Sequence, residues 1–370
     1  MRKHLQSIRY WIIVALLVSS VSTLVQAQDP MFSQHYNNPI YYNPAYIGLT
    51  SGIRARLNYR DQWVGLPQGY KTFDFTMDMA ERSIPGSGGL GLIALTDQAG
   101  AGQVTTTQFG LGSSARVPLT ENMLAQVGFT LSYVQKTIDW SKMVFTDQLH
   151  PRYGVYTGTE FEYPETNTVR YPDISLGAIY RFSQSGYRFT KMQGTLGLGV
   201  HHVFEPNESF IGQRAILPPR WVIHGDIVFD VESGHSSYNR YSQKGSFKFN
   251  PGFMYEKQRE NMIYSFGVNV LKSNVYLGVW FRNQSINLFE ATDAIFMAGV
   301  YAPFNKESRI KLQYSYDYVI YEPLNLAGKS SHEISIVFEF DEFSLFGGGA
   351  SGIGDGYRRA QSREMECCPF

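Results

Sequence analysis

The chain has 370 residues, of which 17% are charged, 15% are aromatic and 2 are cysteines, and its 32 basic residues balance its 32 acidic ones. Soluble domains average about 25% charged residues, so this chain is poor in charge, and its apolar and aromatic content excludes a disordered protein. The balanced charge excludes the broad basic face that nucleic acid requires, and two cysteines exclude both a disulfide scaffold and a cysteine-based zinc module.

Residues 1–27 have the pattern of a secretory signal peptide. A basic start leads into the apolar run 11–18, and Val25-Gln26-Ala27 forms a small-x-small cleavage motif. The apolar run is well short of the roughly 20 residues that a spanning helix needs. We therefore expect export and cleavage before Gln28, which removes more bases than acids and leaves a slightly acidic mature chain.

Residues 28–51 form a leader that is rich in tyrosine, asparagine and proline. Its two Asn-Pro steps favour turns and extended backbone, and its rings and few charges indicate that it is covered rather than solvated. Two interpretations remain open: the leader folds inward as a plug of the structure that the following strands form, or it lies as a strap against the periplasmic rim. The candidate plug or partner-binding residues are Asp29, Pro30, Phe32, Gln34, Tyr36, Asn38, Pro39, Asn43 and Pro44.

The segments 53–60 and 72–79 alternate between apolar and polar side chains, which predicts β-strands with two different environments. The apolar face of the second carries Phe75 among other phenylalanines and methionines, and its polar face carries threonines and aspartates. We expect the apolar faces to meet lipid and the polar faces to line a wet or polar-packed lumen. The lumen-facing candidates are Arg54, Arg56, Arg60, Asp74, Asp78, Arg309 and Lys311.

Further alternating segments bring the total to about fourteen strands, with a range of twelve to sixteen. They are 88–97, 104–117, 123–137, 173–184, 191–203, 219–232, 246–257, 262–272, 274–283, 292–303, 308–320 and 331–341. A secreted β-sandwich also alternates, but these strands are roughly 10–13 residues long, whereas globular strands have roughly 5–6 and membrane strands need roughly 9–11. We therefore predict an all-β fold, a transmembrane antiparallel β-barrel of the outer membrane over residues 52–341, whose last strand pairs with its first.

An even number of strands places both barrel ends in the periplasm and the long connections outside. Segments 138–172, 204–218, 284–291 and 321–330 then form outer loops, and 118–122 and 305–307 form periplasmic turns. Two connections depart from this rule, because 233–245 is long for a periplasmic turn and 257–261 is short for an outer loop. The Gly-rich tail 342–370 is expected in the periplasm, as a candidate contact for a periplasmic ring or lipoprotein.

Little in the chain indicates catalysis or metal binding. His201 and His202 are adjacent on a predicted strand, so we expect one to face the lumen and the other the interface, and not to bind one metal jointly. Gly347-x-Gly349-x-x-Gly352 matches a dinucleotide motif only by its letters, because no βαβ unit surrounds it, and we interpret it as a flexible connector. The strongest outward faces carry no Ser-His-acid set, so we expect no enzyme and no cofactor. Cys367 and Cys368 are candidates for a covalent link to a partner, or have no role.

Motifs along the mature chain resemble one known family. They are Asp29-Pro30-x-Phe32-Ser33-Gln34-x-Tyr36, Asn43-Pro44-Ala45-Tyr46-x-Gly48, Tyr59-Arg60-Asp61-Gln62-Trp63, Leu198-Gly199-Val200-His201-His202-Val203-Phe204-Glu205-Pro206-Asn207 and Ser331-His332-Glu333-Ile334-Ser335. Together they resemble the PorP/SprF proteins of the Bacteroidetes type IX secretion system, from about residue 28 to 341. The resemblance implies an outer-membrane barrel of that system. Members serve either the core export and gliding apparatus or large secreted adhesins whose C-terminal domains they hold at the cell surface. It implies no catalytic residue.

One function is expected and one alternative is kept. The expected function is a non-enzymatic barrel that binds the C-terminal domain of a secreted adhesin and supports secretion and gliding motility. Binding would use outer loops 138–172 and 204–218 or a lumen blocked by the leader. Its other partners are type IX components and outer-membrane lipid, and not nucleic acid. The alternative is a passive diffusion channel or solute transporter, although the inward-pointing charges, such as Arg54 and Asp74, disfavour an apolar cargo.

Overall fold

The computed structural model describes residues 29–50, 52–66, 69–81, 86–100, 102–184, 191–231, 247–284, 292–304, 308–320 and 330–340. Several predicted features lie outside these residues. They are the signal peptide, the tail 342–370 with its glycine motif and its two cysteines, the segments 233–245 and 305–307, and almost all of 284–291 and 321–330.

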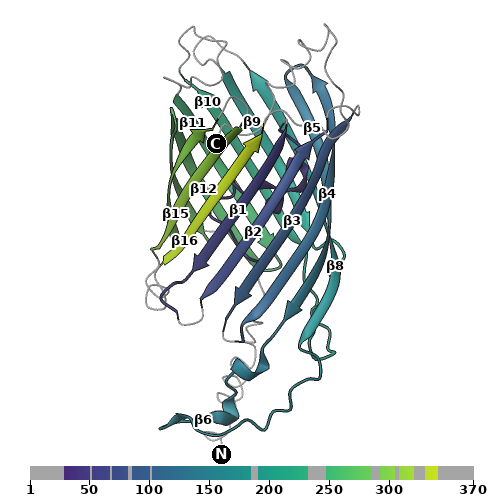
Figure 1. Cartoon of the computed structure of the whole chain (residues 1–370), viewed down its shortest axis with the longest axis vertical. Coiled ribbons are helices and arrows are strands. Elements are labelled where there is room, and N and C mark those ends of the chain that lie inside the picture. Colours follow the sequence, from purple (N-terminus) through teal and green to yellow (C-terminus); the bar gives the residue numbers. More distant parts are fainter. Residues whose placement is uncertain are drawn as a thin grey trace, which may run out of the picture.

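Fourteen antiparallel strands form one closed barrel, as the sequence predicted (Figure 1). They are β1 (Ile53–Gln62), β2 (Tyr70–Ala80), β3 (Ser87–Ala99), β4 (Val104–Thr120), β5 (Met123–Thr137), β8 (Thr168–Gln184), β9 (Lys191–His201), β10 (Arg220–Asp230), β11 (Phe247–Gln258), β12 (Asn261–Lys272), β13 (Val275–Asn283), β14 (Asp293–Pro303), β15 (Ser308–Val319) and β16 (Ser330–Phe340). The first strand pairs with β2 on one side and with β16 on the other, where Ile53 lies opposite Phe340. Closure leaves neither strand as an open edge, which is what a sheet in lipid requires.

Side chains alternate between the outward face of the barrel and its lumen. On β2, Phe73 is 47% exposed on the outward face, whereas the neighbouring Asp74 is fully buried at 0%. On β1, Tyr59 is 41% exposed and Arg60 is 2% exposed. An apolar outer surface around a polar interior is the arrangement of a barrel that sits in lipid, and the period-two pattern of the sequence predicted it.

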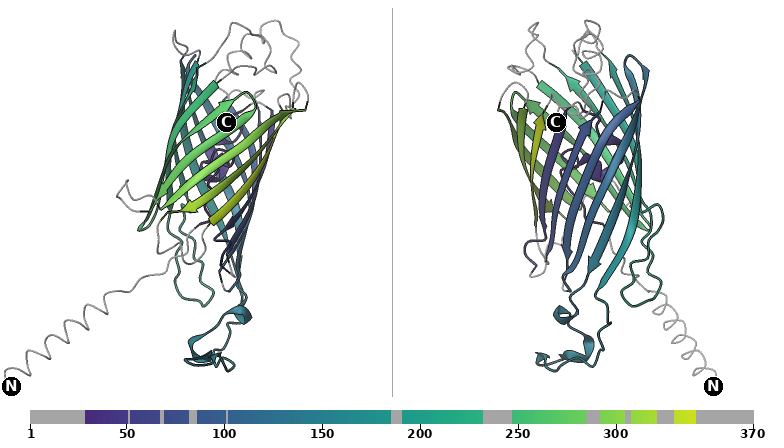
Figure 2. Two further views of the ribbon diagram at one scale, coloured as in Figure 1. Left: turned by 90° about the vertical axis from the view of Figure 1, so that its left-hand side faces the viewer. Right: turned by 45° about the vertical axis from the view of Figure 1, so that its right-hand side comes forward.

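The two ends of the barrel carry connections of different length. We call the end with the long loops 138–167 and 202–219 the outer end, and the opposite end, where β1 begins and β16 ends, the inner end. The first long loop projects from the barrel (Figures 1 and 2). It contains η2 (Trp140–Lys142), η3 (Thr146–Gln148) and a small sheet of β6 (Leu149–His150) and β7 (Gly154–Val155). This loop is shorter than predicted, because β8 begins already at Thr168, which pairs with Thr137.

The connection 257–261 is a tight turn at the outer end. The paired strands run up to Gln258 and resume at Asn261, which are directly opposite each other. Arg259 between them has a φ of 54°. This left-handed conformation matches the twist of a short hairpin, so the connection needs no further residues.

The described leader, residues 29–50, lies inside the barrel (Figure 2). It contains α2 (Pro39–Tyr42) and η1 (Pro44–Tyr46), and each of these short helices begins with a proline, whose missing amide is not needed there. The leader supplies most of one apolar core cluster, which consists of Ile40, Ala45, Tyr46, Ile47 and Leu49 with Leu124 and Ile179 of the wall. No helix of the described chain has both the length and the apolar character to cross a membrane.

Candidate functional site

The leader runs through the lumen from the outer end to the inner end. At the outer end, Asp29 contacts His202 and Arg220, which flank the second long loop. At the inner end, the amide of Gly48 donates to Asp78 Oδ2 at 2.9 Å. The leader therefore meets the barrel wall along the whole length of the lumen.

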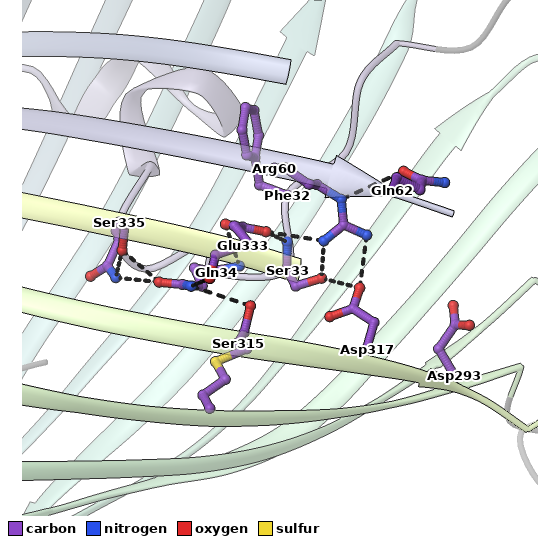
Figure 3. A network of polar contacts seen from close by, with 12 residues as sticks. Phe32, Ser33, Gln34, Arg60, Gln62, Asp293, Ser315, Asp317, Glu333 and Ser335 are labelled. Atoms are coloured by element: carbon purple, nitrogen blue, oxygen red, sulfur yellow. Dashed lines mark hydrogen bonds and ion pairs between the residues drawn. The ribbon is translucent and has the colours of Figure 1, made fainter. Parts of the chain in front are cut away.

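Four charged side chains of the wall surround the start of the leader, and we call them the Arg60 cluster: Arg60, Arg282, Asp317 and Glu333. Figure 3 shows Arg60, Asp317 and Glu333 around Ser33 and Gln34. Arg60 Nη2 lies 2.7 Å from Asp317 Oδ2, and its Nη1 lies 3.1 Å from Glu333 Oε2. Arg282 Nη1 lies 3.2 Å from the same Asp317 oxygen. All four are buried, and their two guanidinium groups and two carboxylates balance one another, as buried charges require. A further carboxylate, that of Asp293, lies at the edge of the cluster, 3.7 Å from Arg282 Nη1.

The Arg60 cluster binds residues 33 and 34 of the leader directly. The Ser33 hydroxyl donates to Asp317 at 2.6 Å and accepts from Arg60 and Arg282, each at 2.8 Å. The carboxylate of Glu333 accepts the consecutive amides of Ser33 and Gln34, at 2.7 and 3.1 Å (Figure 3). Buried amides in a non-regular segment need such partners, so the wall stabilises this part of the leader through its backbone.

Further along, amide side chains connect the leader to opposite parts of the wall. Asn37 Nδ2 donates to Gln313 on β15 at 2.9 Å and to Ser335 on β16 at 2.5 Å. Asn43 Nδ2 donates to the carbonyl of Ala178 on β8 at 3.1 Å, while its side-chain oxygen caps η1. These contacts hold the middle of the leader on both sides of the lumen.

Three glycines form a flat row beneath residues 42–45 of the leader, and we call them the glycine row: Gly128, Gly177 and Gly199. They lie directly opposite one another on β5, β8 and β9. A Cβ at Gly177 would come within 2.0 Å of Asn43 Oδ1, and one at Gly128 within 2.4 Å of the Pro44 carbonyl oxygen. Only glycine permits the leader backbone to approach the wall so closely.

At the outer end, Asp29 is held by a second group of charges that we call the outer clasp: Asp29, Asp173, His202 and Arg220. His202 Nε2 lies 2.7 Å from Asp29, and its Nδ1 lies 3.1 Å from Asp173. Burial alone would lower the pKa of His202, but the two carboxylates raise it to about 10. Burial likewise opposes ionisation of Asp29, yet His202 and Arg220 hold its pKa below the usual range. The clasp therefore ties the leader to both ends of the second long loop.

The prediction that His201 and His202 face opposite sides is wrong. His201 ends β9 in the lumen, where its Nε2 lies 3.0 Å from the carbonyl oxygen of Tyr42. His202 follows the strand with a φ of 57°, and this left-handed backbone interrupts the alternation. Both histidines therefore contact the leader. Within the described residues, no group of three or more His, Cys, Asp or Glu side chains is placed to hold a metal ion.

The other candidate leader residues are buried or partly buried inside the barrel. Tyr42 Oη accepts from the Phe32 amide and donates to its carbonyl, each at 2.8 Å. Gln34 donates to the Glu333 carbonyl at 2.9 Å, and the carbonyl of Pro30 accepts from Tyr41. The Tyr36 ring lies 5.6 Å from that of Trp280. Asn38 is fully buried before α2, and Pro39 and Pro44 start the two short helices.

The candidate lumen-facing residues contact one another or other side chains of the lumen. Arg56 pairs with Asp78 at 2.5 Å, and Arg54 and Arg309 share Glu339 at 3.3 and 3.0 Å. Asp74 accepts from Asn58 at 3.3 Å. Lys311 Nζ lies 4.9 and 5.2 Å from the ring centroids of Tyr276 and Tyr301, within the range of cation–π contacts. Arg60, the remaining candidate, is the centre of the cluster described above.

Several residues that bind the leader were not among the sequence candidates: Arg220, Arg282, Asp317, Glu333 and the glycine row. Glu333 and Asp317 do lie on polar strand faces, and that signal could have identified them. The glycine row has no such signal, because it depends on the register between strands that are far apart in the sequence.

The chain matches the model of one protein family, described as type IX secretion system membrane protein PorP/SprF, over residues 24–338. No curated protein with which the chain was compared matches it. Among solved structures it is similar to the CymD monoaromatic hydrocarbon channel, with 11% identity, a TM-score of 0.46, and coverage of 86% of this chain and 96% of that one. It is also similar to the toluene transporter TbuX of Ralstonia pickettii, with 12% identity, a TM-score of 0.41, and coverage of 82% and 94%. At these identities the likeness concerns the barrel fold alone.

Proposed function

The chain belongs to the PorP/SprF family of type IX secretion system membrane proteins and is an outer-membrane β-barrel, and we propose that it anchors a secreted adhesin at the cell surface. Family membership implies that it works with other components of that secretion system. In this proposal the leader is a plug that stabilises the barrel, and the adhesin docks at the outer end.

The observation that carries the proposal is the leader inside the lumen. A diffusion channel needs a continuous path for its solute, and the lumen is where that path would run. Here the described leader contacts the wall from the outer clasp to the inner end, and several buried charges of the lumen, such as Arg56 with Asp78 and Arg60 with Asp317, form ion pairs. This arrangement favours a docking barrel over the alternative of a passive channel.

The long loops supply the surface for docking. Within the first loop, the ring centroids of Phe145 and Phe161 are stacked 4.6 Å apart, and the edge-to-face pair of Trp140 with Phe210, at 6.2 Å, connects the first loop to the second. Tyr153 and Tyr156 at the end of the first loop are 63% and 69% exposed. Exposed rings on an ordered loop are typical of protein interaction sites.

We expect a loop replacement to separate docking from folding. Replacing residues 149–157 with a Gly-Ser segment of equal length removes β6, β7 and the exposed tyrosines but no barrel strand. The variant should still show heat-modifiable migration on gels, and native purification from cells should no longer recover the secreted adhesin. The same Gly-Ser segment inserted into the turn 121–122, at the inner end, is the matched control and should leave recovery unchanged. Equal recovery of the adhesin with the loop variant, or no secreted protein with the wild type, would contradict the proposal.

A further inference from the structure

A cavity of about 560 Å³ lies in the lumen at the outer end, and we call it the vestibule. The start of the leader lines one side of it, at Asp29, Pro30 and Met31, and Glu208 and Leu217 of the second long loop line another. Its size falls within the roughly 300–1,000 Å³ of small-ligand pockets. The anchoring function proposed above does not use this space.

Carboxylates dominate the charge of the vestibule, and all but one of them have a basic partner. The pairs are Asp29 with His202 at 2.7 Å, Asp173 with His202 at 3.1 Å, Glu208 with Lys136 at 2.8 Å and Glu256 with Arg220 at 3.8 Å. Asp97 also lines the vestibule, and no Lys, Arg or His of the described chain lies within ion-pair distance of it. These carboxylates share only three basic partners, so the vestibule has an excess of negative charge, and Asp97 is the lining carboxylate that lies outside any ion pair of the described chain.

Asp97 is buried at the wall of the vestibule, with 8% of its surface exposed. Its Oδ1 accepts a hydrogen bond from Thr72 Oγ1 at 2.6 Å, which fixes the orientation of the carboxyl group. A buried carboxylate without a cation costs free energy, and that cost is removed when a ligand brings the opposite charge. This makes Asp97 a candidate counter-ion for a ligand.

The surroundings of Asp97 suit a cation on an apolar stem. Thr106 lies directly opposite Asp97 on β4 and adds a hydroxyl oxygen that can accept from an ammonium group. Tyr70, two residues from Thr72 and on the same face, also lines the vestibule, and its ring packs edge-on against Trp63 with centroids 5.1 Å apart. Aromatic rings next to a carboxylate attract cations through their faces and pack against the methylene groups of an alkyl stem.

The chain's own lysine in this region forms its ion pair with another carboxylate. Lys136 lies one strand further along, opposite Thr106. Its ammonium group is bound by Glu208 of the second long loop, whose other carboxylate oxygen accepts from Tyr171 at 2.5 Å. The loop thus keeps Lys136 occupied and leaves Asp97 available.

We propose that the vestibule binds a primary ammonium group on an alkyl stem, with Asp97 as its counter-ion. Two sources share this chemistry: a lysine side chain of an exported polypeptide, and a free small amine from outside the cell. The proposal does not depend on the anchoring function, because it follows from the charges and rings of the cavity.

Calorimetric titration of the purified full-length barrel in detergent tests whether the vestibule binds a primary ammonium group. The probes are 1,5-diaminopentane, a blocked Gly-Lys-Gly peptide and the same peptide with an acetylated lysine. We expect the first two to bind and acetylation to weaken binding at least tenfold. Tighter binding of the peptide identifies a polypeptide as the source, and tighter binding of the diamine identifies a small amine. No binding of either amine, or equal binding of the acetylated peptide, would overturn the proposal.

Two substitutions locate the site. Asp97→Asn keeps the shape and the Thr72 contact but removes the charge, so it should weaken binding at least tenfold while heat-modifiable migration stays unchanged. Glu208→Gln should also weaken binding, because it releases Lys136 to pair with Asp97, and adding Lys136→Met should restore binding. Unchanged affinity in Asp97→Asn would place the ammonium group elsewhere and refute the assignment.

Discussion

The glycine row shows how single residues position the leader. Gly128, Gly177 and Gly199 lie side by side on three neighbouring strands, and the backbone of residues 42–45 rests on them. Around this row the leader is held by polar side chains, such as Glu333, that accept or donate to its backbone. The absence of side chains at these glycines therefore sets how closely the leader backbone approaches the wall. Buried charged side chains of the wall set the orientation of the leader.

The substitution Gly177→Val tests the glycine row. The new side chain would overlap Asn43, because even a Cβ lies 2.0 Å from its Oδ1. Overpacking of this kind typically costs about 1–3 kcal/mol, and here the leader can move more easily than the strand. We expect limited proteolysis to cleave the leader of the variant and not that of the wild type. Gly158→Val, where nothing lies within 4 Å of the added Cβ, is the control. Equal protection of both leaders would show that the row is not required.

The outer clasp predicts a pH dependence. The pKa of His202 is raised to about 10, so its contribution to stability is complete below its ordinary value of 6.5 and is lost as the pH rises through about 10. The pKa of Asp29 is lowered, so its contribution is present at neutral pH and is lost only in strong acid. We expect the thermal midpoint of the wild type to exceed that of His202→Gln at pH 7, and the difference to shrink toward pH 11. A constant difference over this range would show that the imidazolium does not act through its charge.

At the scale of strands, the alternation of apolar and polar side chains accounts for most of the barrel architecture. Each strand has an apolar outward face and a polar inward face, and a shift of register by one residue would exchange them. Phe75 illustrates the outward face, since it lies opposite Leu57 on β1 and Ala94 on β3 near the middle of its strand. The strand pattern therefore fixes both the position of the barrel in lipid and the charge of its lumen.

The substitution Phe75→Arg should block assembly in the membrane. A cation on the lipid face near the midplane costs about 2–4 kcal/mol, which is a large fraction of the stability of a typical domain. We expect the variant to lose heat-modifiable migration in outer-membrane fractions. Phe75→Leu keeps the face apolar and should assemble normally. Normal assembly of the arginine variant would mean that Phe75 does not face lipid.

This strand rule also explains how much the sequence could predict. Alternation identified all fourteen strands, the closure of the last on the first, and the buried positions of Arg54, Arg56 and Arg60, because a two-residue period is local. The contacts of the leader could not be predicted in this way. Ser33 meets Glu333, which is 300 positions away, and no periodicity connects them. His202 was misplaced because its left-handed backbone is a tertiary feature at the end of a strand.

At the scale of the whole molecule, the leader and the closing strands stabilise each other. The Arg60 cluster takes side chains from β1, β13, β15 and β16, which include the two strands at the seam of the barrel. The same cluster binds residues 33 and 34 of the leader. Closing the barrel and seating the leader therefore contribute to one polar network, and a shared buried network of this kind favours a single arrangement.

Deletion of the leader tests whether this segment fills and closes the lumen. Deleting residues 30–48 takes away the segment that contacts the wall from the Arg60 cluster to Asp78, and water would fill the lumen in its place. We expect the deletion variant to give steady open conductance in planar bilayers and the full chain to give little. Gly177→Val, which keeps every residue of the leader but loosens its middle, should give an intermediate conductance. The Gly177→Val variant also provides a conductance measurement if the deletion variant does not assemble. High conductance of the full chain would instead favour the passive channel, because a seated leader would then leave an open path.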